Sequence, residues 1–113
     1  MIKIYHNPRC RKSREALELV KDKVGDPEII EYLKTPPTQE ELQKVVELLG
    51  IKPESLVRKN ESIYKEKYKG KSYTDSEWIQ ILVKNPKLIE RPIVINGDKA
   101  RVGRPPESVL EIL

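Results

Sequence analysis

The first 33 residues constrain the fold most strongly, because they read as a strand, a helix and a strand. "MIKIY" (1–5) alternates apolar and polar side chains, as a short half-buried strand does. From Ser13 onward apolar residues recur at helical spacing until Gly25, and they are Ala16, Leu17, Val20 and Val24. "PEIIEYL" (27–33) predicts a second strand. Two strands joined by one helix over this length predict a parallel pair with a right-handed crossover.

The middle of the chain predicts helices. Thr38 with Glu41, and Thr74 with Glu77, have the spacing of capping boxes. The apolar residues that follow are Leu42, Val45, Val46 and Leu49 in the first helix, and Trp78, Ile81 and Leu82 in the second. The expected helix ends are Gly50 and Asn85-Pro86. Shorter helical turns are expected at 53–57 and from Asn60, as N-cap, to Tyr68.

The end of the chain predicts a hairpin and a last helix. "RPIVI" (91–95) and "DKARV" (98–102) flank Asn96-Gly97, a strong hairpin signal. Arg104-Pro105-Pro106 would start a helix whose apolar side is Val109, Leu110 and Leu113. The chain order is then β-α-β, a helical block and β-β-α. With the block taken as an insertion at about 36–88, this is a thioredoxin-like α/β fold with a mixed sheet, in one domain over residues 1–113.

Composition excludes several classes of protein. Hydrophobic residues make up 37% of the chain and charged residues 35%, so a folded domain is expected rather than disorder. No apolar run is long enough for a membrane span, and the first residues lack the form of a signal peptide, so we expect a cytoplasmic protein. The net charge of +4 fits either a solvated surface or an anionic partner, which would be nucleic acid or a small oxyanion. The most basic stretch (58–71) also carries Glu61 and Glu66, so it predicts mainly an exposed helical face, with anion binding at one or two positions. We expect a monomer without bound cofactor.

Cys10 is the only cysteine, so the chain cannot form an internal disulfide. An inert buried cysteine is the common alternative. Cys10, however, lies after the first strand and just before a helix, where unpaired N–H groups favour a thiolate. Its neighbours are polar and basic, and they include His6, Arg9 and Arg11. These features favour a reactive thiolate.

Two neighbours of Cys10 carry specific expectations. His6 is the only histidine, and it either hydrogen-bonds the loop or assists ionisation of Cys10. One cysteine and one histidine fall short of a metal site. Ser13 completes a C-x-x-S pattern and either donates a hydrogen bond to the thiolate or caps the helix. Any disulfide of Cys10 needs a sulfur from another molecule.

Three arginines stand at predicted element boundaries: Arg58, Arg91 and Arg104. Surface charge is the ordinary role of arginine. Arginine is also the side chain suited to bidentate recognition of an oxyanion. Spacing along the chain leaves both roles open.

Four ordered motifs, "IYHNPRC-x-x-SR", "LVRKN", "RPIVI" and "GRPPE", resemble those of the glutaredoxin-coupled arsenate reductase family over nearly the whole chain. The resemblance implies a thioredoxin-like fold with a helical insertion. It implies that Cys10 is the nucleophile, that His6 helps to lower its pKa, and that Ser13 matches the serine of the motif. It also implies that Arg58, Arg91 and Arg104 bind the oxyanion and that the bond before Pro92 is cis.

The implied reaction is attack of the Cys10 thiolate on arsenate to form a covalent adduct. Glutathione then joins the arsenic, arsenite leaves, and glutaredoxin resolves the mixed disulfide on Cys10. Glutathione and glutaredoxin are thus external reductants rather than bound cofactors.

The loop after Cys10 departs from the characterised reductases, which carry Gly and Thr where this chain has Arg11 and Lys12. It resembles the branch of the family with a "PRCxKSR" loop. Bulk and charge there predict altered oxyanion access, or another substrate for a thiol oxidoreductase of the same family. A further alternative is a regulator similar to the Spx-type proteins that contact RNA polymerase, but those carry a C-x-x-C switch where this chain has C-R-K-S.

Overall fold

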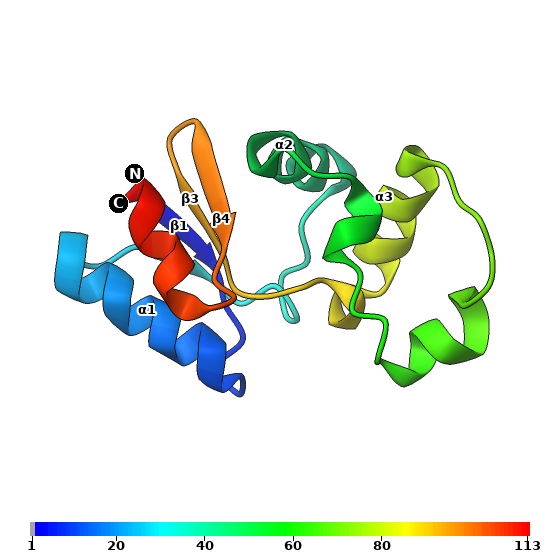
Figure 1. Cartoon of the computed structure of the whole chain (residues 1–113), viewed down its shortest axis with the longest axis horizontal. Coiled ribbons are helices and arrows are strands. Elements are labelled where there is room, and N and C mark those ends of the chain that lie inside the picture. The colour runs from blue at the N-terminus through cyan, green and yellow to red at the C-terminus, as the bar shows by residue number, and fades with distance from the viewer. Residues whose placement is uncertain (1) are drawn as a thin grey trace. The chain divides into compact units, whose positions relative to one another are not determined.

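The computed structural model describes residues 2–113, so that Met1 of the first predicted strand lies outside the described residues. The chain divides into two compact units, Met1–Thr35 with Arg91–Leu113, and Pro36–Glu90 (Figure 1). The first unit holds the sheet and the second holds the helical block. That the two units make one domain with an insertion stays a prediction.

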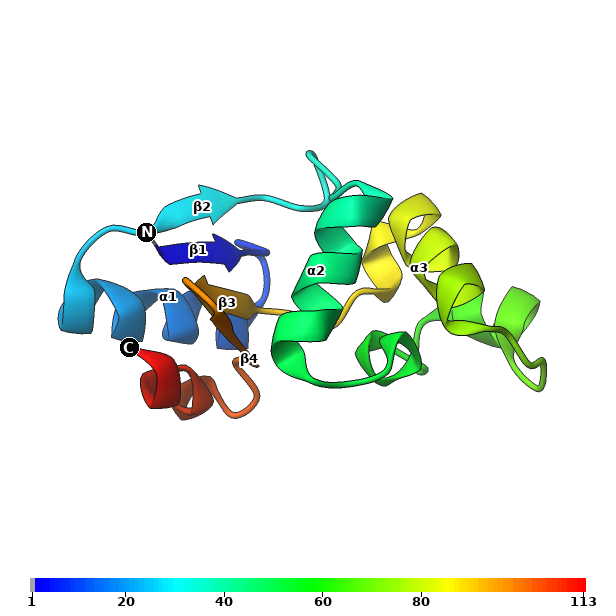
Figure 2. The same cartoon turned by 90° about the horizontal axis from the view of Figure 1, so that it is seen from above.

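The first unit is built on a four-stranded mixed sheet in the order β2-β1-β3-β4 (Figure 2). The strands are β1 (Ile2–Tyr5), β2 (Glu28–Ile30), β3 (Ile93–Asn96) and β4 (Lys99–Val102). β1 pairs in parallel with β2, and the other two pairs are antiparallel. The helix α1 (Arg11–Val24) connects the parallel pair. The predicted α/β fold and its β-α-β opening are confirmed.

β2 is shorter than the predicted strand over 27–33. Glu31 begins a turn there, because its carbonyl accepts hydrogen bonds from the N–H groups of Lys34 and Thr35, both at 2.9 Å. The Glu31 carbonyl is used in this turn and not in the hydrogen bonds of the sheet, so the pairing of β2 with β1 ends at Ile30.

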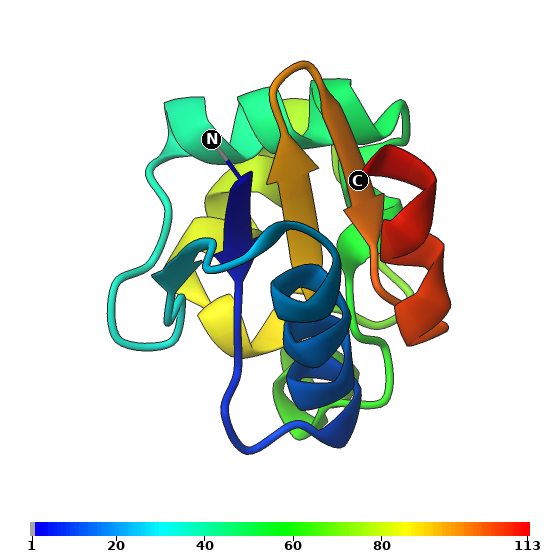
Figure 3. The same ribbon diagram turned by 90° about the vertical axis from the view of Figure 1, so that its left-hand side faces the viewer.

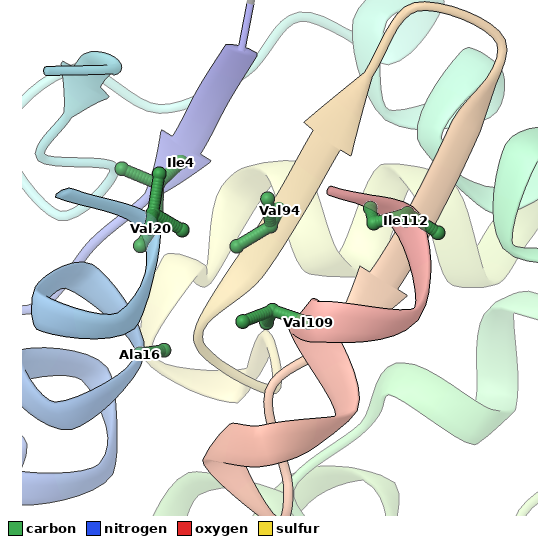
Figure 4. Packing of buried hydrophobic residues seen from close by; sticks show 6 residues of the cluster. All are labelled: Ile4, Ala16, Val20, Val94, Val109 and Ile112. Atoms are coloured by element: carbon green, nitrogen blue, oxygen red, sulfur yellow. The ribbon is translucent and has the colours of Figure 1, made fainter. Parts of the chain in front are cut away.

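One face of the sheet is covered by α1 and by η4 (Pro106–Ile112), which lie side by side in front of the strands in Figure 3. The buried side chains between these elements come from β1, α1, β3 and η4 (Figure 4). They are Ile4, Ala16, Val20, Val94, Val109 and Ile112. This core holds the middle of α1 against the sheet.

The last helix differs from the prediction in its period. η4 is a 3₁₀-helix, and its buried residues are Pro106, Val109 and Ile112. A 3₁₀-helix has three residues per turn, so every third side chain shares one face. The predicted α-helical stripe placed Leu110 inward, and this was wrong, because Leu110 is 42% exposed.

The hairpin between β3 and β4 is present, but its turn is shifted by one residue from the predicted Asn96-Gly97. Asn96 pairs with Lys99, so Gly97 and Asp98 form the two-residue turn. Gly97 has φ +62° and is the first central residue, which is where a type II′ turn requires glycine.

The second unit contains the helices α2 (Gln39–Leu49) and α3 (Asp75–Lys84), the 3₁₀ turns η1 (Pro53–Leu56) and η3 (Pro86–Leu88), and the π-helical turn η2 (Tyr64–Tyr68). Both predicted capping boxes are present, at Thr38 and at Thr74, with the side-chain and backbone hydrogen bonds in place. Within the part of the chain that the structure describes, no helix is long and apolar enough to cross a membrane.

Two details of the helical block differ from the prediction. In α3 the buried side chains are Trp78, Ile79 and Leu82. The prediction placed Ile81 inward instead of Ile79, but Ile81 is only half-buried. The helical turn that ends at Tyr68 begins at residue 62, whereas the sequence predicted a start with Asn60 as the N-cap.

The 3₁₀ register of η4 can be tested with two neighbouring truncations. We expect Val109→Ala to lower the free energy of unfolding by about 2 kcal/mol, because it leaves a cavity in the core. Leu110→Ala should change it by less than about 0.5 kcal/mol, because the side chain is exposed. Urea denaturation of both variants checks this. A larger loss of unfolding free energy in Leu110→Ala than in Val109→Ala would show that the helix has the α-helical register instead.

Candidate active site

Cys10 lies at the N-cap of α1, directly after the loop that follows β1. Its backbone is extended (φ −94°, ψ 121°), and its carbonyl accepts the first helical hydrogen bond, from the Arg14 N–H at 3.0 Å. The residue is buried, with 8% of its surface exposed. An N-cap position faces the unpaired N–H groups and the partial positive charge of the helix start.

Asn7 shapes the loop that carries Cys10, a role that was not predicted from the sequence. Its carbonyl accepts the Cys10 N–H at 3.0 Å, and its Oδ1 accepts the Arg9 N–H at 3.0 Å. Its own N–H donates to Ser13 Oγ at 3.0 Å. The signal for this role is Asn7-Pro8 itself, since an asparagine before a proline favours a turn closed by the asparagine side chain.

Ser13 joins the loop to the helix from a fully buried position. Its hydroxyl oxygen accepts the Asn7 N–H and lies 2.6 Å from His6 Nδ1, with which it is hydrogen-bonded. The hydroxyl is therefore used within the loop. Ser13 acts on Cys10 through its backbone N–H instead, and Cys10 itself occupies the N-cap.

His6 is a buried, neutral partner of Ser13. Burial lowers the pKa of His6, Glu31 raises it, and the charges of Arg14 and Lys21 lower it further, with a lower pKa as the result. A histidine with a lowered pKa is neutral at neutral pH. His6 therefore adds no positive charge to Cys10, and it acts on the loop through Ser13.

The pKa of the Cys10 thiol is lowered from its ordinary value. Burial raises this pKa, but four other groups outweigh burial: in descending order the backbone N–H of Ser13, the charge of Arg91, the backbone N–H of Lys12 and the charge of Arg104. Hydrogen bonds and cations both favour the charged form of a thiol. The thiolate is stabilised at this position.

Arg91 and Arg104 are brought to Cys10 by the segments at the two ends of the hairpin. Arg104 Nη2 donates to Cys10 Sγ at 3.7 Å, and Arg104 Nε donates to the carbonyl of Arg91 at 2.9 Å. The Arg91–Pro92 bond is cis, as the family resemblance implies, and so is the Arg104–Pro105 bond, which was not predicted. Both guanidinium groups thus lie in segments that pass next to the start of α1.

Gly103 allows these segments to approach one another. Its N–H donates to the Pro92 carbonyl at 2.8 Å. A Cβ atom at this position would lie 2.8 Å from Pro92 Cγ, 3.2 Å from Ala16 Cβ and 3.3 Å from Val109 Cγ1. Any side chain would therefore push the segment before Arg104 away from α1.

Arg58, the third predicted arginine, belongs to the second unit. Its Nη1 lies 3.1 Å from Glu61 Oε2 and donates to the Lys87 carbonyl at 3.4 Å. Its backbone N–H donates to the Leu88 carbonyl at 2.8 Å. The Cys10 cluster itself is formed by residues of the first unit.

The two residues that depart from the family motif face solvent. Arg11 Nε donates to Glu15 Oε1 at 2.9 Å, and its side chain is 86% exposed. Lys12 is also exposed and acts on Cys10 through its backbone N–H. The helical i,i+4 pair with Glu15 holds the Arg11 side chain along the outside of α1. The predicted effect of Arg11 and Lys12 on oxyanion access stays a prediction.

The arrangement supports nucleophilic chemistry on an anion. It combines a stabilised thiolate, two backbone N–H groups at a helix start and two guanidinium groups, the donor types that bind oxyanions in proteins. Over residues 2–113, no three side chains of His, Cys, Asp or Glu gather as metal ligands would.

Known proteins resemble this chain along its whole length. The ArsC family matches residues 5–112. The uncharacterized protein YfgD of Escherichia coli K12 is 48% identical over 99% of this chain and 96% of its own, and an arsenate reductase of the same organism is 44% identical over 99% and 80%. The solved structure of an arsenate reductase from Vibrio cholerae superposes with a TM-score of 0.95 at 46% identity, covering 99% of this chain and 97% of that one. The family resemblance and the fold expected from it are confirmed.

The electrostatic account of Cys10 predicts its titration. The rate of alkylation by iodoacetamide, followed against pH, should give a pKa below that of a free thiol, which is about 8.5. Arg104→Ala should raise this pKa, because it removes a cation from Sγ. Lys12→Ala, the matched loss of one charge, should leave it unchanged, because the backbone N–H remains. An equal pKa in Arg104→Ala and wild type would contradict the account.

His6 predicts a specific dependence of stability on pH. Its pKa is lower in the folded chain than in the unfolded chain, where it is about 6.5. As the pH falls below that value, the unfolded state binds a proton that the folded state does not, so the free energy of unfolding decreases. Urea denaturation between about pH 7 and 5 should show this decrease in the wild type and less of it in His6→Gln. Since this chain has a single histidine, equal slopes would contradict the assignment.

Proposed function

Because the chain belongs to the ArsC family, we propose that it is a thiol-dependent reductase that converts arsenate to arsenite through a covalent adduct on Cys10. The observation that carries the proposal is the Cys10 thiol at the start of α1, with a lowered pKa and with Arg104 Nη2 at 3.7 Å from Sγ. An arsenate reductase of E. coli is 44% identical to this chain.

In this proposal the arginines bind the substrate and His6 and Ser13 maintain the loop. Arg91 and Arg104 favour the thiolate in the free enzyme and offset the charge of the bound oxyanion during attack. The family resemblance assigns Arg58 to the same oxyanion, and we include it. Ser13 and His6 are positioning residues, since they hold the turn that keeps Cys10 at the helix start.

The proposed reaction balances its electrons between two sulfur atoms. The Cys10 thiolate attacks arsenic(V) and an oxygen leaves as water after protonation. The thiol of glutathione displaces a second oxygen in the same way. The two sulfur atoms then leave the arsenic joined as a mixed disulfide, and the two electrons they give up reduce arsenic(V) to arsenic(III). One water adds back to the arsenic to give arsenite, so that one water is released overall. Glutaredoxin takes the glutathione from Cys10 by thiol–disulfide exchange and restores the thiol.

The external reductant follows from the single cysteine. No second thiol of the chain can close a disulfide with Cys10, so an external thiol must complete the cycle. The family resemblance implies that glutathione and glutaredoxin supply it. Such a cycle belongs in the cytoplasm, where thiols are kept reduced. We propose that the enzyme acts as a monomer.

Turnover with purified components tests the proposal. With glutathione, glutaredoxin, glutathione reductase and NADPH, we expect arsenate to start oxidation of NADPH. Cys10→Ser should abolish it, because an alcohol is a much weaker nucleophile than a thiolate at neutral pH. Lys71→Ala, an exposed control, should retain the wild-type rate. If arsenate fails while the coupling proteins are active, arsenate is not the substrate.

A further inference from the structure

A hollow of about 260 Å³ lies against the loop that leads to Cys10. All the residues that line it belong to the first unit, and they come from the loop after β1 and from the turn after β2. They are residues 6–9, Glu31, Leu33 and Lys34. Sites that enclose a whole small ligand usually measure about 300–1,000 Å³, so this hollow suits one end of a ligand.

His6 holds its ring proton on the nitrogen that is not bonded to Ser13. Ser13 is fully buried, and its Oγ accepts the Asn7 N–H at 3.0 Å and lies 2.6 Å from His6 Nδ1. The hydroxyl hydrogen therefore needs an acceptor, and Nδ1 of a neutral histidine is one. With Nδ1 as the acceptor, the proton of the neutral ring is on Nε2.

The Nε2–H group of His6 is a donor held for a ligand. Among residues 2–113 it has no hydrogen-bond partner, although only 6% of His6 is exposed. A buried polar group ordinarily finds its partner within the chain. Because His6 lines the hollow, a ligand in the hollow is the partner that this donor can reach.

The charges around the hollow complement a zwitterion. Arg9 and Lys34 contribute positive charge to the lining, and Glu31 contributes a carboxylate. Lys34 Nζ lies 3.5 Å from Glu31 Oε1, and the two side chains are 80% and 41% exposed, so a ligand can reach both. A free α-amino-acid group offers a carboxylate for His6 Nε2–H and the cations, and an ammonium for Glu31. A simple anion would leave Glu31 as a repulsive neighbour.

We propose that this hollow binds the free α-amino-acid end of glutathione, which its γ-glutamyl residue carries. The inference rests on the proposed function, in which the glutathione thiol attacks the arsenic adduct on Cys10. The Cys10 N–H donates to the Asn7 carbonyl at 3.0 Å, which closes a turn and keeps the two Cα atoms within about 7 Å. An extended tripeptide spans about 10 Å, so glutathione held at one end reaches Cys10.

Binding of S-methylglutathione, whose thiol is blocked, tests the site without turnover. His6 is the only histidine, so its imidazole signals in NMR spectra report on the hollow without ambiguity. We expect these signals to shift with a Kd on the order of 1 mM. S-methylcysteinylglycine, which lacks the γ-glutamyl residue, and acetate should shift them much less. Absence of a shift with S-methylglutathione, or an equal shift with acetate, would overturn the inference.

The variant Glu31→Gln tests the ammonium partner. We expect the Kd for S-methylglutathione to rise about two- to fivefold, as for the loss of an exposed ion pair. His6 stays neutral in this variant, because burial lowers its pKa and Glu31, which opposes burial, is removed. Glu28→Gln is the matched control, since it removes the same charge from an exposed residue of β2 outside the hollow, and it should keep the wild-type Kd. Equal Kd values for Glu31→Gln and wild type would contradict the proposal.

Turnover separates failure of this inference from failure of the proposed function. In Glu31→Gln the KM for glutathione should rise by the same two- to fivefold factor, whereas kcat and the KM for arsenate should keep their wild-type values. If the wild type does not reduce arsenate, the proposed substrate fails, and the binding of S-methylglutathione still decides the role of the hollow. Arsenate turnover with an unchanged KM for glutathione in Glu31→Gln would overturn that role.

Discussion

The hydrogen bond from the Asn7 N–H to the buried hydroxyl of Ser13 is the interaction on which the reactive loop depends. It joins the residues after β1 to the first turn of α1, and the same hydroxyl is also hydrogen-bonded to His6 Nδ1. A buried polar group without a partner is costly, so each of these three groups needs the others. With the loop held in this way, Cys10 stays at the N-cap, where the N–H groups of residues 12 and 13 stabilise its thiolate.

The same core that stabilises the sheet also positions the guanidinium groups. Ala16 and Val109 belong to the buried cluster, and both limit the space at Gly103. Gly103 in turn is hydrogen-bonded to the carbonyl of Pro92 and directly precedes Arg104. The approach of Arg104 to Cys10 therefore depends on apolar packing, and substitutions in this part of the core would alter the thiol as well as the stability.

Sequence patterns predicted best what is decided locally. Both capping boxes depend on residues three apart, and both are present at Thr38 and Thr74. The last helix was predicted at the right place with the wrong period, because Val109, Leu110, Ile112 and Leu113 are all apolar and fit either three or 3.6 residues per turn. Burial against α1 and the sheet decides between them.

The candidate site was predictable only in part for the same reason. Cys10 at a helix start could be read from the chain, but its contact with Arg104 joins residues 94 positions apart, and no periodicity indicates such a contact. The family resemblance supplied that partner. The use of the Ser13 hydroxyl, the neutral state of His6 and the position of Arg11 on the outside of α1 depend on burial and rotamer choice, which only the three-dimensional structure defines.

The small exposure of Cys10, 8% of the residue, has a consequence for how a thiol partner gains access. A recessed sulfur admits a small oxyanion or a flexible tripeptide more easily than the surface of a folded protein. In the proposed cycle the mixed disulfide adds a second sulfur about 2 Å beyond Sγ and attaches an extended peptide to it. In that cycle glutathione acts as an adaptor. The disulfide to be exchanged then has its outer sulfur on glutathione, farther from the buried Cys10, where a protein reductant can reach it.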